Sequence, residues 1–531
     1  MSLIESLNQL QREHGHLSDQ TLRDLSTTAG VPLHAIQAVV SFYPHFRTTV
    51  PPKTRVAVCR DMACHLAGAE GLCENLKQAL GEPDQPVHAV SCLGQCDVAP
   101  AVAINDEPVC GADVAAVLDV AAGRKQPETS KRAGPVPAWP HTAHGGPDEH
   151  YGVIKRLLAG ETIDVVGILK ASGLKGMGGA AFPTGVKWQL VAEQAEPLKH
   201  VICNADESEP GTFKDRAILE NLPHLVVEAM AIAGRVVGAQ HGHVFIRHEY
   251  ERQRDIVAAE LDRARRLGIL NDGFDVQITT SPVGYILGEE TALLECMEGK
   301  RGEPRNKPPF PGQVGLHGKP TLINNVETFA AAAAILNRGA DWWNRIGKKG
   351  CQGFKFVSVS GHVRHPGVYQ IPMGTTVKEL IDLAGGVEGG KRLKAFAPGG
   401  ASSNFLPAAK ANVPIDFEQL AKAGSMLGSG ALFVVAEGTD MLELATNVVR
   451  FFRNESCGKC VPCRLGSEKA VQMLDQILTR GGQRAELSLL NDLADTMNQT
   501  SICGLGQVAL NPVLSVAEHF PQDLEKHMTK E

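Results

Sequence analysis

Apolar residues in the first fifty positions recur with the spacing of an α-helix. Ile4, Leu7 and Leu10 fall on one face of such a helix, and Ser18 is placed to cap a second one. We therefore expect residues 1–50 to form an N-terminal helical segment.

From Arg55 to Gly123 the pattern changes, and short β-like apolar runs alternate with helical ones. Strands are expected from Arg55 to Val58 and from Pro86 to Val90. This alternation predicts a small thioredoxin-like domain over residues 51–123. The following stretch, 124–150, is rich in proline and small polar residues, which indicates a linker.

The segment 151–340 carries the largest α/β pattern, with expected strands at 200–203, 243–246 and 274–278. Two strand-like runs and a helical run then predict a β-grasp domain, which we place with its connector at 350–438. The remainder, 439–531, has mainly helical spacing. The expected fold class is thus multidomain α/β with a Rossmann-like central domain.

Length and charge narrow the range of functions. A chain of 531 residues is too long for one hydrophobic core. Its formal charge of -7 is spread along the chain, so neither a nucleic-acid-binding surface nor a polybasic membrane patch is indicated. No stretch of about twenty apolar residues appears, and the N-terminus lacks the pattern of a secretory signal. We expect a cytoplasmic protein that binds neither nucleic acid nor membrane.

Three cysteines in a short run and a fourth much later form the most specific motif. The run is Glu455-Ser-Cys457-Gly-Lys-Cys460-Val-Pro-Cys463, and Cys503 begins a Cys-Gly-Leu-Gly sequence. Gaps of two residues let several thiolates converge from one loop at a helix start, and the distant fourth closes the cage. This spacing predicts a [4Fe-4S] cluster.

A second cysteine set lies near the other end of the chain. Cys59 and Cys64 form one pair and Cys92 and Cys96 another, each on an expected loop after a strand-like run. Two such pairs suit the flatter [2Fe-2S] cluster. A structural zinc site of four thiolates is the alternative, although the gap between Cys59 and Cys64 is wider than zinc-ribbon knuckles usually have.

Residues 173–185 contain five glycines ahead of an expected helix. Glycines let the backbone approach a phosphate or a flat ring, and a helix N-terminus favours anions. The partial match Gly176-x-Gly178-x-x-Ala181 to the dinucleotide fingerprint lacks both the preceding strand and the acidic residue at the right distance. By itself this glycine-rich loop fits a cofactor site or a tight turn equally well.

Further motifs follow the glycine-rich loop in a fixed order. They are Cys203-Asn-Ala-Asp-Glu-Ser-Glu-Pro-Gly211, Tyr285-Ile-Leu-Gly-Glu-Glu-Thr-Ala292, Arg305-Asn-Lys-Pro-Pro-Phe-Pro311 and Asn324-Asn-Val-Glu-Thr328. In this order they resemble the NADH-binding flavoprotein subunit of respiratory complex I and its relatives, over roughly 151–531. The N-terminal 120 residues similarly resemble the [2Fe-2S] thioredoxin-like partner subunit of that enzyme, here fused ahead of the flavoprotein.

The resemblance implies sites for FMN and NAD(H). The implied FMN residues are Gly176, Gly178, Gly179, Lys187, Asn204, Asp206, Glu207, Ser208, Tyr285, Gly288, Glu289, Asn324, Asn325 and Thr328. Phe182 and Phe310 would flank the nicotinamide dinucleotide, and Glu209, Glu290 and Lys307 would bind its polar parts. Taken singly, a phenylalanine is more often core packing and an acidic run a solvated loop, so these roles rest on the matched motifs.

The chain departs from the usual family loop at a few positions. Lys175 and Met177 stand where arginines are common, and Ala181 where a glycine is common. Lys175 keeps a positive charge but loses the planar fork of arginine. Leu190 replaces an aromatic residue commonly found just after the loop. Nucleotide affinity and flavin potential are therefore less defined by the sequence than the fold.

The implied chemistry is electron transfer between carriers. A nicotinamide passes two electrons as hydride and an iron-sulfur cluster accepts one, so a chain with both needs a converter such as FMN. No general acid or base is required for the hydride step, and we expect no catalytic side chain.

The motif details are most similar to the β subunit of NAD-dependent formate dehydrogenases. That similarity implies a partner α subunit with a molybdenum or tungsten pterin centre, which oxidises formate while this chain reduces NAD+. The alternatives are the diaphorase subunit of an NAD-reducing hydrogenase and a complex I-type NADH dehydrogenase. An assembly scaffold without clusters is disfavoured because all eight ligand cysteines are present.

Overall fold

The computed structural model describes residues 2–81, 87–109, 113–125, 139–141, 143–144 and 146–529. Most of the expected linker lies outside these residues. The chain forms two compact units. Unit 1 comprises Met1–Pro51, Trp139–Glu207 and Lys214–Lys355; unit 2 comprises Pro52–Ala138, Ser208–Phe213 and Phe356–Glu531.

Unit 1 is built on a parallel four-stranded sheet in the order β7-β6-β5-β8. Its strands are β5 (His200–Ala205), β6 (His241–Arg247), β7 (Asp275–Ser281) and β8 (Thr321–Asn325). The three strands expected in this segment are confirmed as β5, β6 and β7. The fourth strand was missed because its short Thr-Leu-Ile-Asn-Asn sequence was interpreted only as a cofactor motif.

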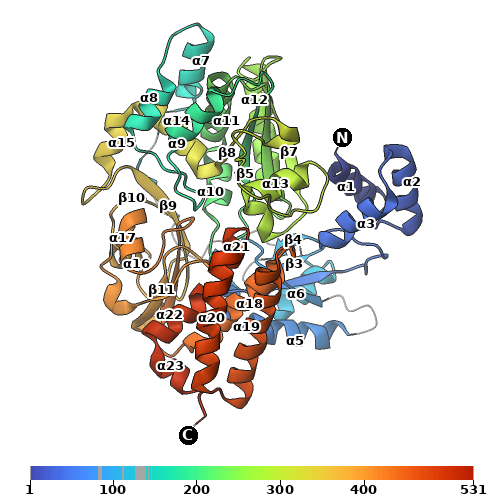
Figure 1. Ribbon diagram of the computed structural model, residues 1–531, viewed down its shortest axis with the longest axis vertical. Helices are drawn as coiled ribbons and strands as arrows, with labels where there is room; N and C mark the ends of the chain where they lie inside the picture. The colour runs from blue at the N-terminus through green and yellow to red at the C-terminus, as the bar shows by residue number, and fades with distance from the viewer. Residues whose placement is uncertain are drawn as a thin grey trace. The chain divides into compact units, whose positions relative to one another are not determined.

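Helices cover this sheet (Figure 1). α11 (Pro223–Val237) and α14 (Val326–Arg338) pack on each other and on β5, whereas α9 (Thr184–Ala192) packs on β8 and α12 (Glu251–Arg266) on β7. The remaining helical elements of unit 1 are α1 (Leu3–His14), α2 (Asp19–Ala29), α3 (Leu33–Phe42), η2 (Pro147–Glu149), α7 (Gly152–Leu158), α8 (Val165–Ala171), α10 (Lys214–Asn221), η3 (Tyr285–Gly288), α13 (Glu290–Met297), η4 (Leu316–Gly318) and α15 (Ala340–Ile346).

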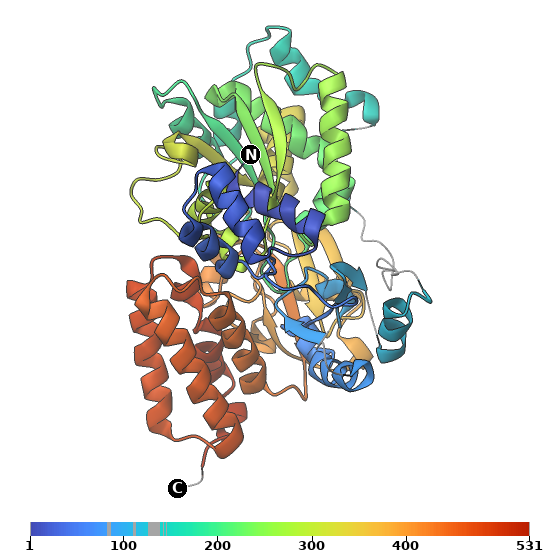
Figure 2. The same cartoon turned by 90° about the vertical axis from the view of Figure 1, so that its right-hand side faces the viewer.

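The N-terminal helices form as the apolar spacing predicts and belong to unit 1 (Figure 2). Ser18 Oγ accepts a hydrogen bond from Thr21 N at 3.1 Å and caps α2. The hydroxyl of Tyr43 donates to Lys300 O at 2.8 Å, which attaches this segment to the loop that follows α13. Among the described residues no single helix is long and apolar enough to cross a membrane, although the bent pair α10 and α11 passes that test by length and composition.

Unit 2 contains a four-stranded sheet in the order β2-β1-β3-β4. Its strands are β1 (Val56–Cys59), β2 (Val87–Val90), β3 (Val102–Ile104) and β4 (Glu107–Val109), and its helices are α4 (Ala63–Leu66), α5 (Ala69–Leu80), η1 (Cys96–Val98) and α6 (Val114–Ala121). β1 and β2 are parallel, as the expected βα alternation requires.

The β-grasp part of unit 2 has a sheet of five strands in the order β10-β9-β13-β11-β12. The elements are β9 (Phe354–Gly361), β10 (Gly367–Pro372), α16 (Val377–Leu383), η5 (Glu388–Gly390), β11 (Leu393–Ala397), β12 (Leu406–Pro407), η6 (Ala408–Lys410), α17 (Phe417–Lys422) and β13 (Ala431–Ala436). The two strands and the helix expected here are confirmed. The stretch treated as a connector supplies three more strands, including the central β13.

The C-terminal part of unit 2 is helical. Its elements are α18 (Met441–Glu455), α19 (Val461–Arg480), α20 (Arg484–Thr500), α21 (Gly504–Val508), α22 (Asn511–His519) and α23 (Pro521–Glu525). α18, α19 and α20 pack side by side in sequence order (Figure 1, Figure 2). Phe451 and Phe452 on α18 are buried in this bundle.

Candidate functional site

The glycine-rich loop connects α8 to α9, so no strand precedes it, as expected. Gly176 N donates to Phe182 O at 2.8 Å and closes the loop on itself. Met177 N donates to Thr328 Oγ1 at 2.9 Å and ties the loop to α14. Thr328, one of the predicted FMN residues, therefore holds the loop in place.

The loop approaches the carboxyl end of β8 at Gly178. A Cβ atom on Gly178 would lie 2.9 Å from Asn325 Cβ, closer than side chains pack, whereas one on Gly176 would meet nothing nearer than 3.5 Å. Ala181 takes a φ of 54°, the left-handed region that favours glycine. This conformation explains physically why a glycine is suited to the position at which this chain has alanine.

Two predicted site residues end adjacent strands of the sheet. Asn204 on β5 pairs in register with Asn325 on β8, and Asn204 Nδ2 donates to Gly288 O at 2.9 Å. The carboxyl edge of a parallel sheet is where such folds bind ligands. Asn324 Oδ1 is buried without a hydrogen-bond partner among the described residues. A buried amide oxygen needs a donor, and the ring and ribityl groups of FMN offer several, so these residues fit the flavin.

The side chain of Asn325 is used inside the protein. Its Nδ2 donates to Asp215 Oδ2 at 2.6 Å, and its Oδ1 accepts from Lys214 Nζ at 3.3 Å and from Glu327 N at 3.0 Å. The last bond caps α14. In this geometry Asn325 contributes a surface for Gly178 to pack on.

A buried charged cluster, which the sequence did not predict, surrounds Asn325. Lys214 lies 2.7 Å from Asp215 and 3.1 Å from Glu327, and Lys355 also pairs with Glu327. Burial by itself lowers the pKa of Lys214, but the two carboxylates raise it well above its usual range. Burial lowers the pKa of Lys355 to about 8. The cluster links α10 to α14 beneath the loop. The sequence could not predict it, because the burial of these lysines is visible only in the folded structure.

Glu207 also turns into the protein. Its carboxylate accepts from Asp215 N at 2.9 Å, Arg216 N at 3.1 Å and the hydroxyl of Tyr250 at 3.0 Å. Burial, followed by the charge of Asp215, raises the pKa of Glu207 to about 7. The neighbouring Asp206 is likewise buried.

The predicted nicotinamide residues have a different environment. Phe182 and Phe310 are 43% and 55% exposed, which is unusual for large aromatic side chains that only fill a core. Exposed rings of this kind are available to stack on a flat ligand. Their exposure therefore favours the predicted role in nucleotide binding over a role in core packing.

Charged side chains line the same part of unit 1. Lys307 Nζ lies 2.9 Å from a Glu289 carboxylate oxygen and 3.4 Å from one of Glu290. Lys187 Nζ lies 3.8 Å from Glu290 and donates to Ile323 O at 3.1 Å. Glu289 also caps α13, which begins just after Tyr285 and η3. These partly exposed pairs can exchange partners with the ribose and phosphate groups of a nucleotide.

Two predicted residues fall in the other unit. Ser208 and Glu209 belong to unit 2, and the other predicted FMN and nicotinamide residues belong to unit 1. Glu209 Oε1 accepts from Ser402 N at 2.9 Å and also from the Ser402 hydroxyl. Burial raises the pKa of Glu209. Its predicted contact with the dinucleotide remains a prediction.

The four N-terminal cysteines are buried together in unit 2. The Sγ atoms of Cys92 and Cys96 are 3.5 Å apart, and Cys59 lies beside Cys64 and Cys92. Hydrogen bonds of the Cys59 thiol to Cys64 and Cys92, together with burial, raise the pKa of Cys59 well above its usual range. Four buried thiols this close together are difficult to ionise without a cation. Iron stabilises the thiolates, so the donor set fits a [2Fe-2S] cluster.

The positions of these cysteines correct one expectation. Cys59 is the last residue of β1, paired in register with Val90, and Cys64 lies in the short helix α4, so neither is on a loop. Among the described residues, backbone N–H groups donate to three of the sulfurs: Gly94 to Cys92 at 3.4 Å, Ala101 to Cys64 at 3.3 Å and Gly211 to Cys96 at 3.3 Å. Such bonds stabilise negative charge on sulfur.

The C-terminal cysteines converge around the start of α19. Burial, followed by the smaller effects of Cys460 and Cys457, raises the pKa of Cys463 to about 11 against the opposing effect of the Ser456 hydroxyl at 3.2 Å. A Cβ atom on Gly506 would lie 2.9 Å from Cys463 Cβ, which shows how closely the Cys503 segment approaches. Three of these four thiols are only partly buried. The set fits a [4Fe-4S] cluster near the protein surface.

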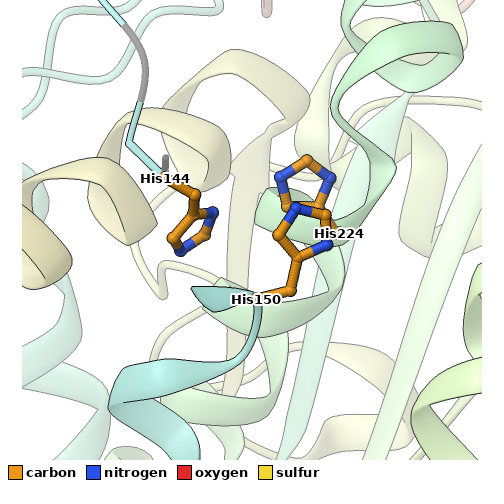
Figure 3. A group of neighbouring side chains, drawn as sticks. All are labelled: His144, His150 and His224. Atoms are coloured by element: carbon orange, nitrogen blue, oxygen red, sulfur yellow. The ribbon is translucent and has the colours of Figure 1, made fainter. Parts of the chain in front are cut away.

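A separate histidine cluster in unit 1 consists of His144, His150 and His224 (Figure 3). One ring nitrogen from each lies within 4.8 Å of the others. However, the rings of His150 and His224 are stacked, with centroids 3.6 Å apart and 3° between planes, and Arg263 Nη1 lies 3.1 Å from His150 Nδ1. Imidazole lone pairs lie in the ring plane, so parallel rings do not direct them at one ion. We interpret the cluster as an aromatic stack.

A flavin site on a parallel sheet and two convergent cysteine sets define a class, the flavin and iron-sulfur oxidoreductases. Family models match four regions: the Nuo51 FMN-binding domain over 169–334, the NADH-ubiquinone oxidoreductase-F iron-sulfur binding region over 443–527, the thioredoxin-like [2Fe-2S] ferredoxin over 1–122 and the SLBB domain over 356–403.

Curated relatives agree with these models. The chain is 42% identical over 386 residues to the HndC subunit of the NADP-reducing hydrogenase of Solidesulfovibrio fructosivorans, covering 71% of this chain and 79% of that one. It is 42% identical over 388 residues to the F-type subunit of the NADH-quinone oxidoreductase of Streptomyces coelicolor, covering 72% and 86%. The chain belongs to the family of F-type subunits of NADH-quinone oxidoreductase.

Among solved structures, the air-oxidised NAD+-reducing [NiFe]-hydrogenase contains a chain that matches with a TM-score of 0.90 and 31% identity, covering 100% of this chain and 94% of that one. This chain is therefore an NAD(P)H-dependent flavin and iron-sulfur oxidoreductase. It carries an FMN-binding domain, a [4Fe-4S] region and a [2Fe-2S] domain, and the zinc alternative for the N-terminal cysteines is set aside. The individual ligand residues and the domain limits given above remain predictions.

Proposed function

We propose that this chain is the diaphorase subunit of a cytoplasmic, soluble NAD-dependent formate dehydrogenase. A partner subunit with a molybdenum or tungsten pterin would oxidise formate to CO2, and this chain would pass the electrons to NAD+. The observation that carries the diaphorase part is the combination, in one chain, of an exposed aromatic and charged nicotinamide site with two cysteine sets that fit clusters. The formate part rests on the motif similarity.

The side chains of unit 1 would bind and orient the two cofactors. Phe182 and Phe310 would flank the nicotinamide dinucleotide and leave one face of the nicotinamide ring open to the flavin, while Lys307 and Glu290 would bind the polar parts of the dinucleotide. Lys187 and Asn324 would hold the flavin. FMN, when bound, supplies the exchange between two-electron and one-electron carriers. No side chain needs to move a proton for the hydride step.

The C-terminal cysteines suit contact with a partner. Val461 and Leu465 flank Cys463 on α19, are 55% and 58% exposed, and lie four residues apart on one helix face. Exposed apolar side chains beside a shallow cluster are suited to a subunit that accepts or donates electrons there. We assign the Mo/W subunit to this face.

The diaphorase subunit of an NAD-reducing hydrogenase is the second candidate. It is favoured by the match of the whole chain to the NAD+-reducing [NiFe]-hydrogenase. A complex I-type NADH dehydrogenase is the third candidate, supported by the NADH-quinone oxidoreductase relatives. The match to the Streptomyces coelicolor relative spans 388 residues, or 72% of this chain.

The deciding experiment is to purify the complex anaerobically through an affinity tag on this chain and to follow NAD+ reduction with formate and, separately, with hydrogen. Formate-driven reduction supports the proposal, and metal analysis of the complex then distinguishes molybdenum from tungsten. Reduction by hydrogen alone, with NADH-to-dye activity retained, would move the chain to a hydrogenase. NADPH tested beside NADH would establish the nucleotide preference.

A further inference from the structure

The short segment Ser208–Phe213 carries a predicted nucleotide residue and also contacts a predicted cluster ligand. Although its neighbours on both sides belong to unit 1, the segment itself belongs to unit 2. Gly211 N donates to Cys96 Sγ at 3.3 Å. Of the three sulfur donors described above, this N–H group is the one that does not come from the thioredoxin-like domain.

Several contacts fix this segment on the β-grasp domain. Thr212 Oγ1 lies 2.8 Å from Ser429 Oγ, and Phe213 N donates to Ser358 Oγ at 3.0 Å. Thr212 N donates to Glu209 O at 3.0 Å, which closes a tight turn around Gly211. Gly211 takes a φ of 92°, so the turn requires glycine at the position that donates to sulfur.

The carboxylate of Glu209 anchors the start of this turn. It accepts from the backbone and the hydroxyl of Ser402, and its second oxygen lies 3.5 Å from Ser429 Oγ. Gly400 makes room for it, because a Cβ atom there would lie 3.2 Å from Glu209 Cδ. The side chain of Glu209 is thus held at both oxygens, and its residue begins the turn whose N–H reaches Cys96.

We propose that Glu209 is a positioning residue for the [2Fe-2S] cluster: its carboxylate, held by Ser402 and Ser429, aims the N–H of Gly211 at Cys96 Sγ. A hydrogen bond to a ligand sulfur stabilises the more negative, reduced cluster and so raises its reduction potential. Releasing the anchor lets the turn move and weakens this bond. The inference rests on the proposed ligand set of Cys59, Cys64, Cys92 and Cys96.

The test uses the full-length chain and a matched pair of variants, Glu209→Ala and Glu209→Gln. Both remove the carboxylate, so any effect of its charge on the cluster is shared, but only glutamine keeps an oxygen that accepts from Ser402. Redox titration followed by EPR of the [2Fe-2S] signal gives the midpoint potential. We expect the potential of Glu209→Ala to lie below that of Glu209→Gln, with the reduced-to-oxidised ratio at a fixed potential lower by about two- to twelvefold, since a hydrogen bond contributes roughly 0.5–1.5 kcal/mol.

A second variant keeps the charge and removes two donors, Ser402→Ala with Ser429→Ala. It should shift the [2Fe-2S] potential downward from the wild type and leave the FMN content and the [4Fe-4S] signal unchanged. Ser425→Ala is the control, because it deletes a serine hydroxyl of the same domain that donates to Asn404 O and does not contact Glu209. Equal potentials for Glu209→Ala and Glu209→Gln, or a double variant with the wild-type potential, overturn the proposal.

The outcomes are separable from those of the proposed function. A wild type without a [2Fe-2S] EPR signal would contradict the ligand assignment, whichever partner the chain has. A normal signal with no formate activity affects only the partner assignment. A raised KM for NADH in both Glu209 variants at an unchanged cluster potential would favour the nucleotide role of Glu209 instead.

Discussion

Ala181 and Asn325 show how single residues determine the shape of the flavin site. Ala181 holds the loop in a left-handed conformation that costs about 1–3 kcal/mol for a residue other than glycine. Asn325 was expected to contact FMN, but both ends of its amide are bound to Asp215, Lys214 and the backbone of α14. The loop is therefore placed by packing on Asn325 and by hydrogen bonds to its neighbours.

At the same scale, the exposed ring of Phe182 can be removed without disturbing the core. We expect Phe182→Ala to raise the KM for NADH by about tenfold, because an aromatic stacking contact is worth roughly 0.5–1.5 kcal/mol beyond the buried area. The melting temperature should change little. Steady-state kinetics with NADH and an artificial dye provide the measurement.

Leu383→Ala is the control for this change, since Leu383 is also an exposed apolar residue but lies on α16 in unit 2. Its KM should equal that of the wild type. An unchanged KM for Phe182→Ala would mean that this ring does not cover the nicotinamide.

At the scale of elements, the ends of β5 and β8 and the start of α9 and α14 meet around the glycine-rich loop. The parallel sheet places Asn204 and Asn325 in register at its carboxyl edge. Met177 N and Thr328 Oγ1 then link the loop to α14. The site depends on these junctions, and the buried cluster of Lys214, Glu327 and Lys355 holds two of the helices under it.

Gly178 of the loop and Gly71 on α5 provide a matched test of this packing. Gly178→Ala should lower the FMN content of the purified protein by about tenfold or more, because its Cβ atom would lie 2.9 Å from Asn325 Cβ and displace the loop. Gly71→Ala, on α5 in unit 2, whose Cβ atom would meet nothing within 4 Å, should retain its FMN. Flavin absorbance per protein measures both, and equal FMN contents would contradict the proposed close approach.

The histidine stack makes unit 1 sensitive to acid. Burial lowers the pKa of His150 to about 4 and that of His224 to about 3, with nearby positive charge adding to the effect. The unfolded chain binds protons on these residues below about pH 6.5, and the folded chain does so only near their lowered values. Stability is therefore complete above pH 6.5 and decreases as the pH falls from there toward 4.

The pair should lower the free energy of unfolding by up to about 4 kcal/mol between pH 7 and pH 5, and by less to the extent that solvent screens the partly exposed rings. His224→Asn should show a shallower decrease over that interval, as measured by denaturant titration at each pH. The exposed His14 on α1 offers a control, and His14→Asn should follow the wild-type curve. Parallel curves for His224→Asn and the wild type would show that the stack does not titrate in this way.

At the scale of the whole molecule, the two cysteine sets lie in unit 2 and nearly all the predicted flavin and nucleotide residues lie in unit 1. Hydride exchange and cluster chemistry are thus assigned to separately packed parts of one chain. Losing one cluster should leave the flavin chemistry intact.

Cys463→Ser tests this separation. It should abolish the [4Fe-4S] EPR signal and formate-driven NAD+ reduction, while NADH-to-dye activity and FMN content stay within about twofold of the wild type. Cys59→Ser is the companion variant and should remove only the [2Fe-2S] signal. Loss of both signals in either variant would indicate that the cysteine sets are not independent.

The sequence by itself determined the features that local chemistry controls. Cysteine spacing predicted both clusters, apolar periodicity predicted the N-terminal helices and the strands β5, β6 and β7, and glycine density located the loop. These follow from short-range rules of ligand reach, periodicity and backbone freedom. The order of motifs then identified the family resemblance.

Tertiary structure decided what depends on partners distant in the chain. Strand β8 became recognisable only through its pairing with β5, and β13 only through its place between β9 and β11. The buried pairs of Lys214 and Lys355 are visible only when Glu327 is brought beside them. Likewise, the carboxylate of Glu209 meets Ser402, 193 residues away in sequence, only in the folded chain. Which charges are buried and which distant residues come into contact leave no pattern in the local sequence. They depend on how distant segments pack, so only the tertiary structure determines them.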